Sequence, residues 1–361
     1  SAASDVYKRQ GFMKDVAAHN LEGKTLSTGW KVLKKKAKTA ASTGGNFSVC
    51  YDVEKDGKIC FMKAIDFTCH LANNFAGRSV VDLMTDMLGQ FQYERDLSIY
   101  CQNNRVTKVA FVIESGEEIV TGFTYGIVPY LIFEMADGDV RTLLAYSAEL
   151  DFAWKLKSLR DIAVGLKQLH GIGVAHQDLK PSNVLLFHDE SKIGDLGRSM
   201  CPALNGPYDE LEYSGDFTYA PPEVLYRFHI GDWEQRTYLS DCYLLGSLVV
   251  FYTTGVSMNA LIMNHLPASL QPVHYRGSFD EVETYLLNAF QKALIDVRSS
   301  IPFEVIKDRL VKLIEYLCYP TPAKRGHPKN ISSIGSNYNL TRFVSELDYL
   351  RLKSELELLK Y

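Results

Sequence analysis

The sequence predicts an α+β fold in two parts, a small antiparallel sheet with one main helix followed by a larger helical region. Short apolar runs separated by a turn signal at Asp56-Gly57 fill the first third of the chain, which is typical of strands. After Asp137-Gly138 the apolar residues recur at helical spacing instead. Strands gathered before helices indicate α+β layering with a boundary between the two parts.

The first part is expected to contain five strands and one helix. β-Branched and aromatic residues predict strands at about 30–33, 47–53, 59–65, 106–113 and 128–135. Six apolar side chains near helical spacing predict a helix over 79–102, although Gly89 lies within it.

The second part is expected to be mostly helical. Residues 154–170 place their apolar side chains on one helical face, and Gly171 marks the end of that helix. Further helices are predicted over the ranges 240–254, 279–299, 303–318 and 340–360.

The composition of the chain argues against several classes of protein. With 361 residues, 46% of them apolar, the chain can form one large two-lobed domain. A net charge of −4 gives no reason to expect nucleic acid or an anionic membrane as a partner. Seven dispersed cysteines without a C-x-x-C pair argue against disulfides or zinc, and no apolar run reaches the length of a membrane span. We therefore expect a soluble, cytoplasmic protein.

One eight-residue segment, His176-Gln177-Asp178-Leu179-Lys180-Pro181-Ser182-Asn183, follows a predicted helix and precedes an apolar run. It resembles the catalytic loop of protein kinases, usually written H-R-D-L-K-x-x-N. The resemblance implies that Asp178 is the catalytic base, that Lys180 neutralises the transferred phosphoryl group, and that Asn183 binds a metal ion. Small-molecule phosphotransferases carry a similar loop, so this segment alone indicates phosphoryl transfer and leaves the acceptor open.

A second segment, Gly194-Asp195-Leu196-Gly197, places its aspartate 12 residues after Asn183 (195 minus 183). It resembles the D-F-G metal motif of the same family, with Leu in place of Phe. The resemblance implies ATP and Mg²⁺ as cofactors, with Asp195 and Asn183 as metal ligands.

Three later features match the family in order. Pro221-Pro222-Glu223 stands in place of A-P-E, Ser240-Asp241 is followed by Gly246 as in the central helix of the helical lobe, and Arg325 occupies the place of the family's late arginine. A structural Glu223–Arg325 ion pair is therefore implied. Because small-molecule phosphotransferases lack this trio, the acceptor is expected to be a protein.

Two residues of the first part match the family's nucleotide-binding pair. Lys63, in Cys60-Phe61-Met62-Lys63, occupies the place of the lysine in V-A-I-K, which reaches the α- and β-phosphates. Its expected helix partner is Glu94, 31 residues later (94 minus 63), which implies an insertion around residues 72–78.

The remaining nucleotide contacts are implied by weaker matches. The segment Thr43 to Cys50 aligns with the glycine-rich loop only if two glycines are replaced, which puts nucleotide affinity in doubt. The segment Leu131 to Asp139 resembles the adenine-binding hinge. The residues expected to contact nucleotide are Gly44, Gly45, Phe47 and Cys50 in the first segment, and Glu134, Ala136 and Asp139 in the second.

Two positions depart from the family pattern. Gln177 replaces the arginine that in many kinases binds a phosphate on the activation loop, so activity is expected not to require phosphorylation of that loop. Asp216 stands where the family usually has a threonine near the base, and the sequence alone assigns it no role.

Together these matches identify a eukaryotic-like serine/threonine protein kinase with a bilobal protein-kinase-like fold. The expected organisation is an N-terminal tail at 1–28, of which the first ten residues are a candidate non-native remnant, and a kinase domain at 29–330. Within this domain the lobes are expected at 29–135 and 138–330. After it, residues 331–361 are expected to form a leucine-rich helical extension that could bind a partner of its own. A pseudokinase scaffold and a small-molecule phosphotransferase remain as alternatives.

Overall fold

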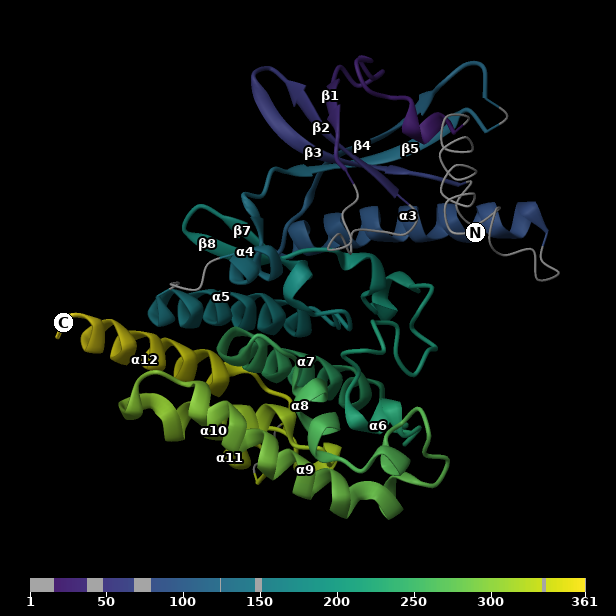
Figure 1. Cartoon of the computed structure of the whole chain (residues 1–361). Coiled ribbons are helices and arrows are strands. Elements are labelled where there is room, and N and C mark those ends of the chain that lie inside the picture. Colours follow the sequence, from purple (N-terminus) through teal and green to yellow (C-terminus); the bar gives the residue numbers. More distant parts are fainter. Residues whose placement is uncertain are drawn as a thin grey trace, which may run out of the picture. The chain divides into compact units, whose positions relative to one another are not determined.

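The computed structural model describes residues 16–37, 48–67, 79–123, 125–146, 151–332 and 336–360. The chain divides into two compact units. Unit 1 comprises Ser1–Asn103 and Ala110–Asp137, and unit 2 comprises Asn104–Val109 and Gly138–Tyr361. The predicted α+β fold, a sheet with one main helix followed by a helical part, is confirmed (Figure 1).

Unit 1 is built on a five-stranded antiparallel sheet in the order β1-β2-β3-β5-β4. Its strands are β1 (Lys31–Lys35), β2 (Ser48–Lys55), β3 (Lys58–Ile65), β4 (Val112–Ile119) and β5 (Ile127–Glu134). Side chains alternate between faces along each strand, so Tyr51, Val53, Cys60 and Met62 gather in one buried layer.

The prediction of a strand at 106–113 is wrong. The fourth strand runs over Val112–Ile119 instead, and its central residues are polar because β4 is an edge strand. Val106 and Val109 are nevertheless buried, in a loop that belongs to unit 2, where Val109 bridges to Ile193. Their apolar character therefore reflects burial without a strand.

A segment before the first strand completes the core of unit 1. Leu21, Leu26 and Trp30 are buried against the sheet, and the Tyr51 hydroxyl donates a 2.8 Å hydrogen bond to the Ala18 carbonyl. The short helix η1 (Ala17–His19) lies in this segment. From Val16 onward, the stretch predicted as a tail contributes side chains to the core.

The long helix α3 (Val80–Asn103) is the main helix of unit 1. It is continuous through Gly89, as predicted within one residue at each end. Phe91 and Leu97 lie on its buried side, and Glu94 is buried between them. This placement brings an acidic side chain onto the inner face of the helix.

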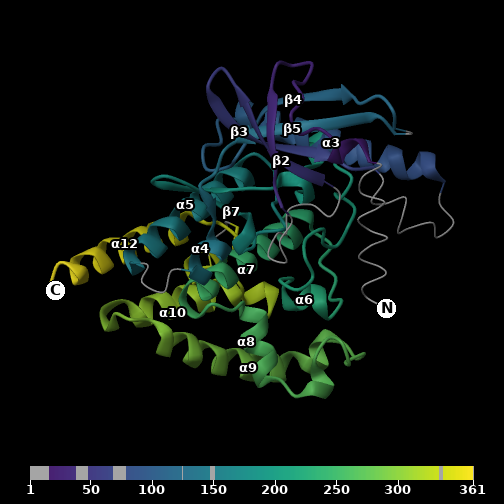
Figure 2. The ribbon, with the colours of Figure 1, turned by 45° about the horizontal axis from the view of Figure 1, so that its top comes forward.

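Unit 2 is helical, with a small three-stranded sheet (Figures 1 and 2). Its longer helices are α5 (Phe152–Gly171), α7 (Trp233–Thr254), α9 (Phe279–Ser300), α10 (Glu304–Cys318) and α12 (Thr341–Leu358), and its strands are β6 (Gly138–Asp139), β7 (Val184–Phe187) and β8 (Glu190–Ile193). Shorter helices are α4 (Val140–Tyr146), η2 (Pro181–Asn183), η3 (Leu196–Arg198), η4 (Pro202–Leu204), α6 (Pro222–Leu225), α8 (Met258–His265), η5 (Ala268–Leu270), η6 (Pro322–Lys324) and α11 (Pro328–Ile331).

The helices of unit 2 begin at residues suited to cap them. Asp151 caps α5, and Ser278 and Glu281 form a reciprocal capping box at the start of α9. Helix α7 begins seven residues before the predicted range, because Asp232 caps it through the Gln235 N–H. Helix α12 lies along α5 (Figure 1).

Among the described residues, no single helix is long and apolar enough to cross a membrane. Helices α7 and α8 would pass such a test only as a pair, and they meet at a bend of 81°. Most side chains of α7 are buried inside unit 2, as expected for a core helix.

Candidate active site

The loop that follows α5 is held in place by Asp241 of α7. The Asp241 carboxylate accepts the backbone N–H groups of His176 and Gln177, both at 2.8 Å. His170 Nε2 lies 2.9 Å from the same carboxylate. Gln177 has a left-handed backbone with φ of 63°, and these hydrogen bonds stabilise that uncommon conformation.

Asp178 and Asn183 form the centre of the loop, and both are buried. Asn183 Nδ2 donates to the Asp178 carbonyl at 2.8 Å and to the Asp178 carboxylate at 3.0 Å. Lys180 Nζ lies 3.0 Å from Asp178 Oδ2. The three residues predicted as catalytic therefore lie together, and each fixes the orientation of the next.

Asp195 lies two residues after the end of β8, beside this loop. The Gly194 N–H donates to the Asn183 carbonyl at 2.8 Å, and His176 Nε2 donates to the Gly194 carbonyl at 3.1 Å. A Cβ at position 194 would approach Leu185 Cδ1 to 2.7 Å, so a larger residue would require the Leu185 side chain to move. Asp195 itself has a φ of 57°, which turns the chain away from the strand.

The donor atoms present fit a magnesium ion held with phosphate. Asn183 commits its Nδ2 to Asp178, which leaves the amide oxygen as the atom for a cation. Asp195 supplies a carboxylate, and Mg²⁺ prefers oxygen ligands and usually takes one or two from protein carboxylates. The described residues contain no group of three or more His, Cys, Asp or Glu side chains placed to hold a metal, and this ligand set does not require one.

The charge of Lys180 is stabilised by its carboxylate neighbours. Burial alone would lower the pKa of Lys180, but Asp178, Asp216 and Asp195 outweigh it and raise that pKa above its ordinary value. Lys180 therefore stays an ammonium ion throughout the neutral range.

Asp216 is a site residue whose role the sequence did not reveal. Its backbone N–H donates to Asp178 Oδ1 at 3.0 Å, and its Oδ2 lies 3.5 Å from Lys180 Nζ. Its Oδ1 accepts the hydroxyl and the N–H of Thr218, at 2.7 and 3.0 Å. Burial would raise the pKa of Asp216, but the Thr218 hydrogen bonds and Lys180 lower it below its ordinary value, so Asp216 is an anion.

The segment between Asp195 and Asp216 is ordered by its own side chains. Asp209 accepts the Cys201 N–H at 2.8 Å on one oxygen and the Gly206 N–H at 2.7 Å on the other. Gly215 lies against the Gln177 carbonyl so closely that a Cβ there would lie 2.0 Å from its oxygen. The segment is thus fixed beside the catalytic loop.

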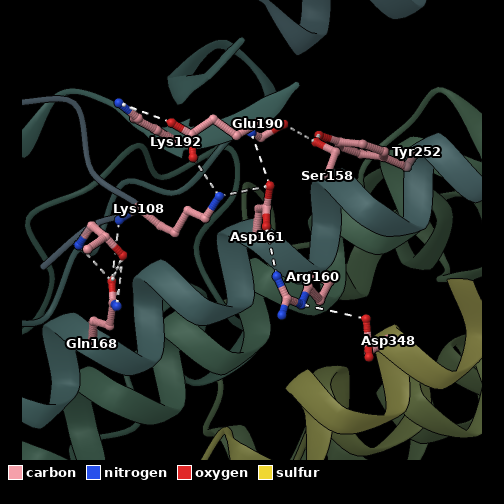
Figure 3. A network of polar contacts seen from close by, with 11 residues as sticks. Lys108, Ser158, Arg160, Asp161, Gln168, Glu190, Lys192, Tyr252 and Asp348 are labelled. Atoms are coloured by element: carbon pink, nitrogen blue, oxygen red, sulfur yellow. Dashed lines mark hydrogen bonds and ion pairs between the residues drawn. The ribbon is translucent and has the colours of Figure 1, made fainter. Parts of the chain in front are cut away.

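A polar network behind the loop ties α5 to β8 and to the segment 104–109 (Figure 3). Lys108 Nζ lies 2.7 Å from Glu190 Oε2 and 3.2 Å from Asp161 Oδ2. Arg160 lies beside Asp161 at 3.2 Å and reaches Asp348 of α12 at 3.7 Å (Figure 3). Asp161 is a buried carboxylate in the middle of this network.

Unit 1 holds the predicted lysine and glutamate pair. Lys63 Nζ lies 2.9 Å from both carboxylate oxygens of Glu94, so the sheet strand and α3 are joined by an ion pair. Lys63 pairs across the ladder with Cys50 of β2. The spacing of 31 residues, longer than the family norm, therefore does not prevent the expected contact.

The residues predicted as an adenine-binding hinge belong to both units, with Glu134 and Ala136 in unit 1 and Asp139 in unit 2. Glu134 ends β5, and Ala136 follows it half-buried. Asp139, in unit 2, accepts the Thr142 N–H and hydroxyl, both at 2.9 Å, which gives its carboxylate a local role at the start of α4. Gly44, Gly45 and Phe47 lie outside the described residues.

Comparison with known proteins agrees with this geometry. Residues 84–333 match the family model described as the protein kinase domain. The mouse hormonally up-regulated neu tumor-associated kinase is 27% identical over 199 residues, which are 54% of this chain and 24% of that protein. The serine/threonine-protein kinase GIN4 of Saccharomyces cerevisiae is 28% identical over 204 residues, which are 55% of this chain and 16% of that protein.

The matched stretch thus spans a quarter or less of these relatives' length. A solved crystal structure of a kinase domain aligns with a TM-score of 0.57 at 15% identity, over 86% of this chain and 95% of the other, and shares the fold. The family match covers more than half of the chain and includes both the Asp178 loop and Asp195. On these grounds the chain belongs to the protein kinase family.

Proposed function

We propose that this chain is a serine/threonine protein kinase that uses ATP and Mg²⁺ to phosphorylate a hydroxyl on a protein. The proposal depends on one observation: Lys180 Nζ and Asn183 Nδ2 both contact the Asp178 carboxylate, each at 3.0 Å. A protein that does not catalyse phosphoryl transfer would not require a carboxylate, an ammonium and an amide in this arrangement.

Each residue would have a defined task. When bound, Mg-ATP supplies the transferable γ-phosphoryl group. Asp178 would accept the proton of the attacking hydroxyl, and Lys180 would stabilise negative charge that develops on the phosphoryl oxygens. Asn183 and Asp195 would hold the metal, while Lys63, fixed by Glu94, would bind the α- and β-phosphates as the family resemblance implies.

The serine/threonine type is supported by Lys180 within the loop and by the similarity to the serine/threonine-protein kinase GIN4 of Saccharomyces cerevisiae. A protein acceptor is supported by the Glu223–Arg325 pair, which small-molecule phosphotransferases lack. Arg325 Nη1 lies 2.6 Å from Glu223 Oε1.

The test compares the protein with its Asp178→Asn variant in transfer of labelled phosphate from Mg-ATP to a mixture of serine, threonine and tyrosine peptides. We expect label on serine and threonine, and a loss of about 10²- to 10⁴-fold in the variant, which is the usual contribution of a general base. Asp189→Asn is the matched control, since Asp189 is an exposed turn residue in the same unit.

A pseudokinase would give a different pattern. Mg-ATP would raise the melting temperature while the protein and its Asp178→Asn variant both showed no transfer. Transfer to an aminoglycoside or a sugar in preference to peptides would instead support a small-molecule phosphotransferase.

A further inference from the structure

Asp216 directly contacts Asp178, the residue proposed as the base. Its backbone N–H donates to Asp178 Oδ1 at 3.0 Å, so the two residues are in direct contact. The Asp216 side chain is 35% exposed, which leaves part of its carboxylate accessible to a bound segment of substrate.

One lysine lies near both Asp178 and Asp216. Lys180 Nζ lies 3.0 Å from Asp178 and 3.5 Å from Asp216, so one ammonium is shared by two carboxylates. Asp195 also acts on Lys180 electrostatically. Asp178 and Asp216 thus compete for the same ammonium, and the Thr218 hydrogen bonds to Asp216 add no positive charge.

An extra anion here has a cost for phosphoryl transfer. The phosphates of a nucleotide are negatively charged, and like charges in a partly buried site repel strongly. A neutral threonine, the usual residue at this position in the family, would avoid the repulsion. A cationic side chain of the substrate would offset this repulsion at the partly exposed Asp216 carboxylate.

The next residue presents a surface suited to a cation. The Phe217 side chain is 60% exposed, and its ring packs edge-on against Tyr213, with centroids 5.5 Å apart. A carboxylate attracts Lys or Arg side chains through charge, and an exposed aromatic ring attracts them through its quadrupole.

We propose that Asp216, assisted by Phe217, is a specificity-determining residue that selects serine or threonine acceptors with a Lys or Arg side chain close to the hydroxyl. The inference rests on the proposed function, because it concerns the substrate of that reaction. If Asp216 had only a structural role, its substitution would lower kcat/KM equally for all substrates. The proposal instead requires the change in kcat/KM to depend on the charge of the substrate.

The experiment is a cycle of enzyme and peptide variants. Serine peptides carry Lys, Gln or Glu at one position, one or two residues before or after the acceptor, and kcat/KM is measured for each with the wild type, Asp216→Asn and Asp216→Thr. Asp216→Asn keeps the shape of the side chain and an oxygen for Thr218. Glu210→Gln is the matched control, since it removes an exposed acid from the same segment.

We expect the wild type to prefer Lys over Gln by about fivefold for at least one position, as for a partly exposed charge pair. Asp216→Asn and Asp216→Thr should lose that preference, while Glu210→Gln keeps it. Melting temperatures of all variants establish that they fold. A Lys preference that is the same within twofold in wild type and Asp216→Asn overturns the inference, whereas absence of transfer to every peptide overturns the proposed function instead.

Discussion

Arg325 and Glu223 form a two-pronged ion pair in the interior of unit 2. Arg325 Nη1 and Nη2 donate to the two Glu223 oxygens at 2.6 and 2.7 Å, and Arg325 is 0% exposed. The guanidinium also donates to the carbonyls of Tyr319, Leu239 and Pro320, at 3.0, 3.1 and 3.3 Å. The pair thus joins α6 to the turn after α10, with the buried charges fully hydrogen-bonded.

Removing this arginine should destabilise the protein severely. Arg325→Met leaves the Glu223 carboxylate buried without its counter-ion, and we expect the free energy of unfolding to fall by about 3–5 kcal/mol. Urea denaturation measures the change. The control is Arg309→Met at the exposed pair with Glu346, where we expect a loss of about 1 kcal/mol or less. Equal losses in the two variants would contradict a structural role for the buried pair.

Lys63 should matter for turnover as well as for folding, because its removal leaves the buried Glu94 without this counter-ion. Lys63→Met removes the ammonium that contacts both carboxylate oxygens of Glu94. We expect kcat/KM for ATP to fall by about 10²-fold or more, because a preorganised positive charge for the phosphates is lost. Lys55→Met is the control, since Lys55 forms a comparable 3.1 Å pair with Glu114 in the same sheet. Steady-state kinetics with circular dichroism separates activity from folding, and equal activity in the two variants would refute the assignment.

Activity should not depend on phosphorylation of the segment between Asp195 and Glu223. Gln177 is neutral and donates to the Thr237 carbonyl at 2.8 Å, and Asp209 already orders the segment through backbone N–H groups. We expect protein treated with phosphatase, and shown by mass spectrometry to carry no phosphate, to keep its turnover within about twofold. A tenfold loss that recovers during incubation with ATP would be the opposite result.

His327 should make the stability of unit 2 depend on pH. Burial, together with the charges of Arg342 and Lys329, lowers the pKa of His327 below its ordinary value of about 6.5. Its Nδ1 accepts the Lys329 N–H at 3.2 Å and caps α11, which requires a neutral ring.

Because the pKa of His327 is lower in the folded protein than in the unfolded chain, the neutral ring stabilises the fold at pH values above the pKa of the unfolded chain. This stabilisation is lost as the pH falls to the pKa of the folded protein. The melting temperature of the wild type should therefore drop more steeply from about pH 7 to pH 5 than that of His327→Asn, which caps the helix without titrating. Parallel profiles for the two proteins would exclude His327 as the source.

The geometry of the Asp178 loop was predictable because its residues are close together in the sequence. Asp178, Lys180 and Asn183 lie within six residues, and the order of helix, loop and strand around them follows from apolar periodicity. The Lys63–Glu94 contact was harder to predict, because it depends on the register of a strand and a helix on either side of an unmatched stretch.

Other features depend on tertiary contacts that leave no local signal. The sequence marks Asp216 as a departure from the family's threonine but gives it no role, and only its contacts with Asp178 and Lys180 show that it belongs to the site. The burial of Leu21 and Leu26 follows from a sheet formed later in the chain. The one signal available for Asp161 was its place between apolar residues on the inner face of a predicted helix.

The polar network around Lys108 bears on how this protein can be divided for experiments. Residues 104–109 are covalently flanked by unit 1 yet belong to unit 2, where Ile193 donates its N–H to the Lys108 carbonyl at 2.9 Å. A recombinant fragment starting at Gly138 would lack that acceptor, and Asp161 would lose the ammonium 3.2 Å away. Expression of the helical half alone should therefore succeed only when residues 104–109 are grafted back onto it.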